Sequence, residues 1–204
     1  MNVHGGLVVG GGGNKDVEEL VRVYTVPKAG SAAIKAEDMK AERGPLTASE
    51  ELKAEGNFYG VAATKTAIYV TCNGDDAKGW ISKISLSGTK LGKLQRFIST
   101  KEAVEVDAPV AITISKRGEI VVGQMGEISV EGDSLLTYYS PKDKKLIASH
   151  KTGLHDIAGL AYSQSNRLYA VDFAWIKTTD GGLFRLDSDG KGGVSPTKIA
   201  GLDK

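Results

Sequence analysis

The sequence predicts an all-β fold built from repeated four-stranded sheets, the β-propeller architecture, and three observations predict it. Small apolar segments recur about every 50 residues, which is the period of a propeller blade. Each repeat divides into four strand-length runs separated by turn residues such as Gly, Asn and Asp. Within a repeat the runs change from small and apolar to polar, as expected if the first strand lies at a crowded axis and the fourth at the solvated rim.

The chain opens with a partial blade over residues 1–30. His4–Gly10 aligns with the second strand of the later repeats, and Leu20–Val26 has the alternating apolar residues of a third strand. No first strand is predicted before them. The chain is therefore expected to enter this blade at its second strand.

Residues 31–56 depart from the strand pattern and are predicted to be an insertion with one or two short helices. The runs 31–43 and 47–55 are rich in helix formers, begin with capping residues and stop at glycine. The insertion replaces or decorates the outer strand of the partial blade. The alternative is that Ala33–Met39 itself forms that outer strand.

Three complete blades follow, over residues 57–104, 105–153 and 154–204. Their predicted strands are Phe58–Thr64, Ala67–Cys72, Trp80–Leu86 and Lys93–Ile98; Pro109–Ser115, Glu119–Gln124, Ser134–Ser140 and Lys145–His150; and Ile157–Ser163, Arg167–Asp172, Gly182–Asp187 and Thr197–Gly201. The chain of 204 residues thus forms one incomplete propeller domain. Because so short a ring exposes apolar blade faces, we expect missing blades, self-association or a partner chain to complete it.

Composition excludes several classes of function. The net charge is +1, with 41% hydrophobic and 25% charged residues, so no basic field attracts nucleic acid or an anionic membrane. The single cysteine, Cys72, permits neither an intrachain disulfide nor a cysteine-based zinc site. No apolar run has the about 20 residues of a membrane-spanning helix, and the N-terminus lacks the features of a signal peptide. We expect a soluble protein of undetermined compartment.

In the last blade, Gly159–Tyr162, Leu168–Asp172 and Gly181–Asp187 approximate the successive patterns G-L-A, L-Y-V-x-D and G-x-(I/V)-x-R-(I/L)-D. In these segments the chain resembles blades of the NHL/SMP-30-like propellers, a group of the six-bladed type. The likeness is partial in the two preceding blades, and it implies a fold more than an activity. The group contains calcium- or zinc-dependent lactonases, strictosidine-synthase-like enzymes and binding propellers. The lactonases hold a metal at the axis with a Glu, two Asn/Asp positions and an Asp, and this full set is not found in the sequence.

Candidate metal ligands lie where two kinds of loop meet. In a propeller, the entries into first strands and the loops between second and third strands surround one mouth of the channel. Asn57, Asp107, Asp156 and Asp172 fall in these segments, and their oxygens suit Ca²⁺ or another divalent cation. The alternative is that these residues cap turns through local hydrogen bonds.

His155, Asp172, Phe173 and Trp175 are the candidate ligand-binding residues. An aromatic side chain beside a carboxylate at a channel mouth suits stacking on a small ligand, and packing against a neighbouring blade is the alternative. His155 next to Asp156 suggests an oriented base, but adjacent side chains on a strand point to opposite faces. No catalytic residue is therefore assigned.

Together these observations favour a propeller that binds a small molecule or a protein at the channel mouth and catalyses nothing itself. The alternative is a metal-dependent lactonase- or esterase-like hydrolase of the SMP-30/gluconolactonase type. A third interpretation is a scaffold whose blade edges recruit another protein. Under all three interpretations we expect neither a nucleic-acid nor a membrane partner.

Overall fold

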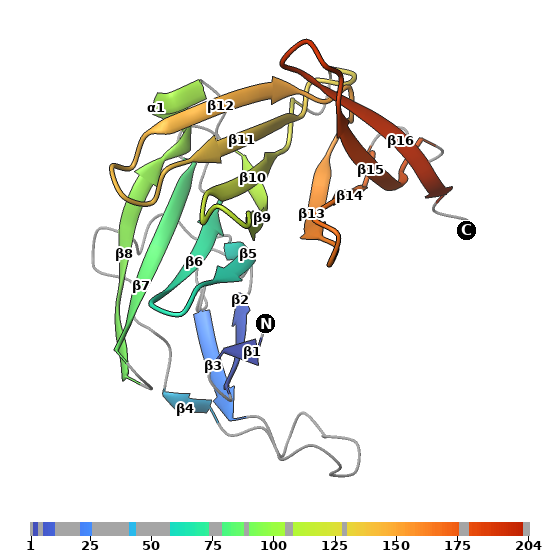
Figure 1. The fold of residues 1–204 in the computed structure, drawn as a ribbon. Coiled ribbons are helices and arrows are strands. Elements are labelled where there is room, and N and C mark those ends of the chain that lie inside the picture. The colour runs from blue at the N-terminus through green and yellow to red at the C-terminus, as the bar shows by residue number, and fades with distance from the viewer. Residues whose placement is uncertain are drawn as a thin grey trace, which may run out of the picture.

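The computed structural model describes residues 2–3, 6–10, 21–25, 41–43, 58–73, 79–87, 90–104, 108–127, 130–175 and 180–201. These residues form four antiparallel sheets, and in each sheet four strands pair in chain order (Figure 1). We call the sheets blades 1 to 4.

Blade 1 holds β1 (Asn2–Val3), β2 (Gly6–Gly10), β3 (Val21–Thr25) and β4 (Ala41–Arg43). Blade 2 holds β5 (Phe58–Ala63), β6 (Ala67–Cys72), β7 (Trp80–Ser87) and β8 (Lys90–Ser99). Blade 3 holds β9 (Pro109–Ile114), β10 (Ile120–Gln124), β11 (Leu135–Tyr139) and β12 (Leu146–Lys151). Blade 4 holds β13 (Ile157–Tyr162), β14 (Leu168–Asp172), β15 (Gly182–Ser188) and β16 (Val194–Gly201).

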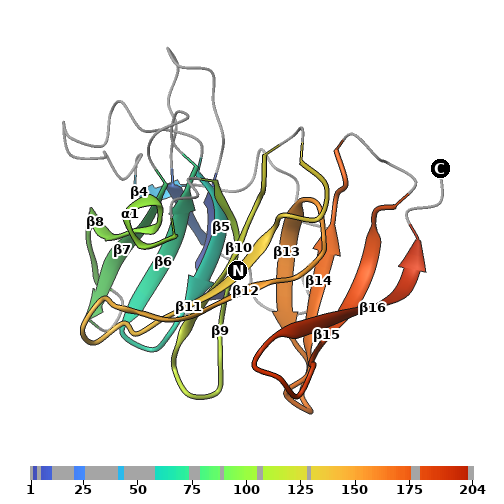
Figure 2. The same ribbon diagram turned by 90° about the horizontal axis from the view of Figure 1, so that it is seen from above.

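The blades follow one another along an arc, with blades 1 and 4 at its two ends (Figure 1). First strands of successive blades lie side by side, β5 against β9 and β9 against β13. The fourth strands β8, β12 and β16 lie on the outside of the arc, and Figure 2 shows blades 2, 3 and 4 in the same succession from above. The predicted propeller architecture is confirmed, with small apolar strands inside and polar strands outside.

The core of blades 2 to 4 lies between the blades, where the faces of neighbouring sheets pack together. One cluster joins Tyr69 and Ile81 of blade 2 to Ile112 of blade 3. The next joins Leu136 of blade 3 to Phe184 of blade 4. Every residue of β6 and of β10 is buried, which explains why these strands are apolar runs without alternation. In β14, buried residues alternate with more exposed ones, because only one face of blade 4 is covered in the part of the chain that the structure describes.

Three features of the structure differ from the sequence prediction. The expectation of no strand before His4–Gly10 is wrong, since β1 pairs with β2 through Val3 and Gly6; a two-residue strand is too short to show a period. Ala41–Arg43, at the end of a predicted helix, is the strand β4, because pairing with β3 outweighs the weak helix preference of this segment. The short helix α1 (Thr100–Val104) between β8 and β9 was not predicted.

The remainder of the expected insertion, residues 31–40 and 44–56, lies outside the described residues, and so does the alternative strand Ala33–Met39. Among those that are described, no helix is long and apolar enough to cross a membrane.

Inner strands of neighbouring blades approach so closely that one position requires glycine. A Cβ added to Gly60, the third residue of β5, would lie 2.4 Å from the carbonyl oxygen of Val110 and 2.8 Å from Cγ2 of Ile112 in blade 3. Real Cβ atoms do not approach neighbours this closely, so an alanine would push blades 2 and 3 apart. Gly159 holds the same place in β13, but its added Cβ would meet only Val171 of its own blade, at 3.5 and 3.6 Å.

We therefore expect Gly60→Ala to lower the free energy of unfolding by about 1–3 kcal/mol, the usual cost of overpacking. Gly159→Ala is the matched control and is expected to change it by less than about 0.5 kcal/mol. Urea unfolding followed by tryptophan fluorescence at low protein concentration measures both. Equal losses in the two variants would contradict the close contact at β5 and β9.

Candidate functional site

The loop before blade 4 and the loop after β14 are held together by one buried carboxylate. Asp172, the last residue of β14, is 1% exposed. Its Oδ2 accepts the backbone N–H of His155 at 2.9 Å, and its Oδ1 accepts those of Asp156 at 2.8 Å and Ala174 at 3.0 Å. Three backbone donors thus converge on one side chain, as in a capped turn.

Asp156 makes the reciprocal connection between the same two loops. Its Oδ2 accepts the N–H of Trp175 at 2.7 Å, and its carbonyl oxygen accepts the N–H of Phe173 at 2.9 Å. Asp156 is 5% exposed. The predicted site residues of blade 4 therefore do come together, and the two aspartates hold the two loops together through hydrogen bonds to the backbone.

These two carboxylates do not by themselves form a cation site. Both carboxylate oxygens of Asp172 and Oδ2 of Asp156 accept backbone N–H groups, which compete with a metal for the lone pairs. No group of three His, Cys, Asp or Glu side chains in the described ranges is placed to hold a metal ion. Asn57 and Asp107, the other expected ligands, lie outside the described residues. The divalent-cation site expected from the sequence therefore stays a prediction.

His155 has a carboxylate partner, but it is not the adjacent Asp156. Its Nδ1 accepts the backbone N–H of Gly132 at 3.2 Å, which places the proton of the neutral imidazole on Nε2. That nitrogen lies 3.8 Å from Oδ2 of Asp180, in the loop before β15. With Nδ1 occupied by a backbone donor and Nε2 protonated, His155 lacks a free lone pair for a general base. Sequence reasoning missed Asp180, which looks like an ordinary turn residue before Gly181-Gly182.

The aromatic residues Phe173 and Trp175 are exposed and touch each other. Their exposed fractions are 47% and 58%, and their rings meet edge to face with centroids 5.4 Å apart. They extend the alternation of β14, in which Asp172 is buried and Val171 is 39% exposed. Since β14 buries its other side against blade 3, these three side chains share the side of blade 4 that is turned away from blade 3. We call Val171, Phe173 and Trp175 the open face.

The penultimate residue of the second strand shows what the open face lacks. In blade 2 this residue is Thr71, whose hydroxyl donates to the carbonyl of Val110 in blade 3 at 2.7 Å. In blade 3 it is Gly123, where an added Cβ would lie 2.4 Å from Cγ2 of Ile157 in blade 4. In blade 4 it is Val171, against which no further blade packs within the described residues.

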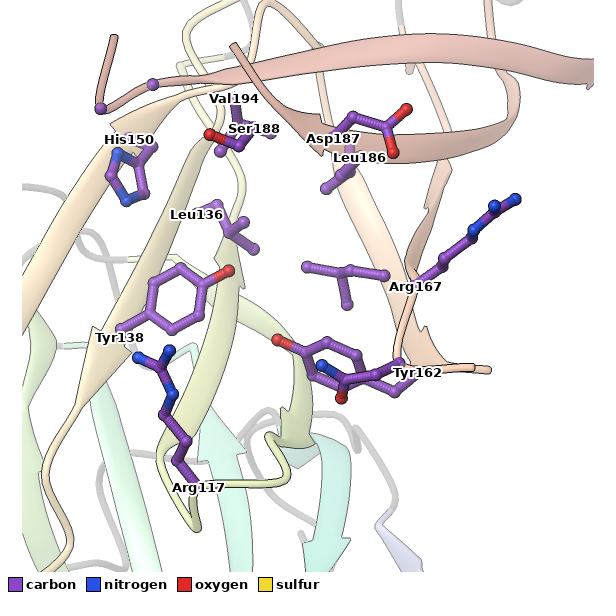
Figure 3. Close-up of a pocket in the computed structure, with 14 residues that line it drawn as sticks. Arg117, Leu136, Tyr138, His150, Tyr162, Arg167, Leu186, Asp187, Ser188 and Val194 are labelled. Carbon is purple, nitrogen blue, oxygen red and sulfur yellow. The ribbon is translucent and has the colours of Figure 1, made fainter. Parts of the chain in front are cut away.

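A second candidate site is a pocket of about 600 Å³ between blades 3 and 4 (Figure 3). It lies at the other end of the blades, by the turns that join first to second and third to fourth strands. We call it the interblade pocket. Its principal lining residues are Arg117, Leu136, Tyr138, His150, Tyr162, Arg167, Leu168, Leu186 and Asp187. Sequence reasoning missed it because no single segment contributes more than a few of these residues.

Comparison with known proteins supports the fold. No protein-family model and no curated sequence matches the chain. Among solved structures, the chain is similar to a gluconolactonase from Xanthomonas campestris, with a TM-score of 0.50 and 15% identity over 75% of this chain and 42% of that one. It is also similar to a luciferin-regenerating enzyme, with a TM-score of 0.56 and 15% identity over 88% of this chain and 55% of that one. The class that the fold defines is therefore a β-propeller. The chain spans about half the length of these two structures.

The capping role of Asp172 predicts a loss of stability in Asp172→Asn, which replaces an accepting oxygen by an NH₂ group facing backbone donors. We expect the free energy of unfolding to fall by about 1–3 kcal/mol, the cost of buried groups left without partners. Asp180→Asn, at a side chain that is 54% exposed, is the control and is expected to change little. Urea denaturation measures both. Unchanged stability of Asp172→Asn would contradict the capping role.

Proposed function

We propose that this chain is a binding propeller without chemistry of its own, and that it binds another β-sheet through the open face. The observation that carries the proposal is the position of Val171. Thr71 and Gly123, at the same place in the two preceding blades, each contact the first strand of the next blade. Because Val171 has the same position in blade 4, we expect the open face to contact the first strand of a further blade.

The existing contacts define the chemistry of the partner strand. Ile112 and Ile157 each place Cγ2 against the position of a glycine in the preceding blade. Gly159 also lacks a side chain, so blade 4 has room there for a β-branched side chain from the first strand of the partner. Phe173 and Trp175 add the large aromatic area that typically dominates the energy of protein interfaces.

We commit to a second copy of this chain as the partner. Successive blades pack in one direction, so within the described residues blade 4 is without a successor and blade 1 without a predecessor. Blade 1 of one copy can therefore pack against the open face on blade 4 of another copy. Two such contacts close a ring of two copies, and eight blades lie within the range of known propellers.

The expected result is a concentration-dependent dimer in size-exclusion chromatography with light scattering. Val171→Lys is expected to raise the dimer dissociation constant by at least about tenfold, since it places a charge in the centre of the contact. Ile147→Lys is the matched control, because Ile147 is a 52% exposed apolar residue of the outer strand β12. A chain that stays monomeric at high concentration, or an equal effect of Ile147→Lys, would refute the open face as the contact.

The second candidate is a metal-dependent lactonase- or esterase-like hydrolase. The specific observation in its favour is the similar fold of a gluconolactonase. On that hypothesis Asn57, Asp107, Asp156 and Asp172 hold the divalent cation, although the described pair of aspartates is occupied by backbone donors.

Hydrolysis assays separate the two candidates. Under the binding proposal, lactones and aryl esters are not turned over, either with added Ca²⁺ or Zn²⁺ or after treatment with a chelator. Hydrolysis that is lost with a chelator, restored by one cation and abolished in Asp156→Asn would establish the hydrolase instead.

A further inference from the structure

We propose that the interblade pocket binds a small organic anion, with an apolar or aromatic body inside the pocket and a carboxylate or phosphate at its rim. The pocket lies at the end of the blades opposite His155 and Asp172, so this site is independent of the open face. Its volume of about 600 Å³ is in the range of small-molecule sites.

The inner wall of the pocket is apolar and aromatic. Leu136 of blade 3 and Leu168 and Leu186 of blade 4 are buried and line it together with two tyrosines, Tyr138 and Tyr162. Figure 3 shows the two phenol rings reaching toward each other from the two blades. Such a wall removes the body of a ligand from water without leaving buried polar groups unpaired.

The tyrosine pair provides a hydrogen-bond donor for the ligand. Burial raises the pKa of both hydroxyls, so both keep their protons at pH 7. The protonated hydroxyl of Tyr138, which lines the pocket, can therefore donate to an oxygen of the ligand.

The acidic groups around the pocket are each engaged close to their own turn. Asp187 accepts from Nε of Arg185 at 2.6 Å. Asp189 accepts the N–H groups of Lys191 and Gly193 at 2.7 and 2.8 Å. Glu119 accepts from the hydroxyl of Ser115 at 2.8 Å.

The arginines are different. Within the ranges that the structure describes, Arg117 and Arg167 have no ion-pair partner. Their guanidinium groups are therefore the charges at this rim that can pair with an incoming anion.

Two matching turns hold these arginines in place. The hydroxyl of Ser115 accepts the N–H of Arg117 at 3.3 Å, and that of Ser163 accepts the N–H of Arg167 at 3.1 Å. Nζ of Lys116 joins the two turns by donating to the carbonyl of Gln164 at 3.4 Å.

The two arginines lie on opposite walls of the pocket. In Figure 3, Arg117 and Tyr138 belong to one wall of the pocket, whereas Arg167 extends outward from the other wall. The anionic group of the ligand therefore binds first to Arg117 and Tyr138. Arg167 contributes less and from the other side.

The test uses probes of matched shape in a binding titration followed by NMR or calorimetry. Benzoate and phenyl phosphate are expected to bind, and benzyl alcohol, which has the ring without the charge, at least about tenfold more weakly, as expected for a charge-assisted hydrogen bond. Inorganic phosphate, which has the charge without the ring, is expected to be weaker than phenyl phosphate. The better of benzoate and phenyl phosphate distinguishes a carboxylate site from a phosphate site.

Variants locate the binding. Arg117→Gln is expected to lower the affinity for the better-binding probe about tenfold, and Arg167→Gln to lower it by a smaller factor. Tyr138→Phe keeps the ring and removes the donor, so it also weakens binding. Lys142→Gln removes a positive charge from an exposed turn that does not line the pocket and is expected to leave binding unchanged.

Three outcomes would overturn the proposal: benzyl alcohol binding as tightly as benzoate, inorganic phosphate binding as tightly as phenyl phosphate, or Arg117→Gln binding like the unmodified chain while its circular dichroism shows it folded. The Val171→Lys variant keeps this test apart from the dimer. Probe binding by that variant supports the pocket even where the open face fails as an interface.

Discussion

The close contact between the inner strands of successive blades is the constraint on which this structure depends. The chain passes so near its neighbour at Gly60 and Gly123 that an added Cβ would lie 2.4 Å from the next blade. First strands must therefore be small, and second strands must be apolar on both sides, as β6 and β10 are. The polar fourth strands follow from the same geometry, because they lie where the blades diverge.

This constraint also decides how much of the fold could be predicted from the sequence. The strand at Ala67–Cys72 was predicted with its observed bounds, because a run buried on both faces and ended by turn residues stands out in the sequence. β1 and β4 were not predicted, since two or three residues carry no period and a partner strand decides their conformation. Ala41–Arg43 illustrates the point: its composition favours a helix, and pairing with Val23 and Tyr24 makes it a strand.

The site was less predictable than the fold, for two physical reasons. An aspartate at the end of a strand looks the same in sequence whether it binds a metal or caps a loop, and the three N–H groups that donate to Asp172 are known only from the structure. Contacts between distant segments, such as His155 with Asp180, have no local pattern at all. The interblade pocket is an extreme case, because its walls belong to two blades whose spacing the sequence does not specify.

The buried aspartates and the exposed aromatics are two consequences of one alternation. The pleat that turns Asp172 inward turns Val171 and Phe173 outward. The hydrogen bonds of Asp172 that hold the loop therefore also fix the positions of the residues of the open face. Asp156 holds the backbone of Trp175 and Phe173 directly. An aromatic pair anchored in this way loses little conformational freedom on binding, which makes an exposed patch effective as a contact. Burying two carboxylates is costly unless their hydrogen bonds are satisfied, and here the backbone donors that satisfy them are those that hold the open face in shape.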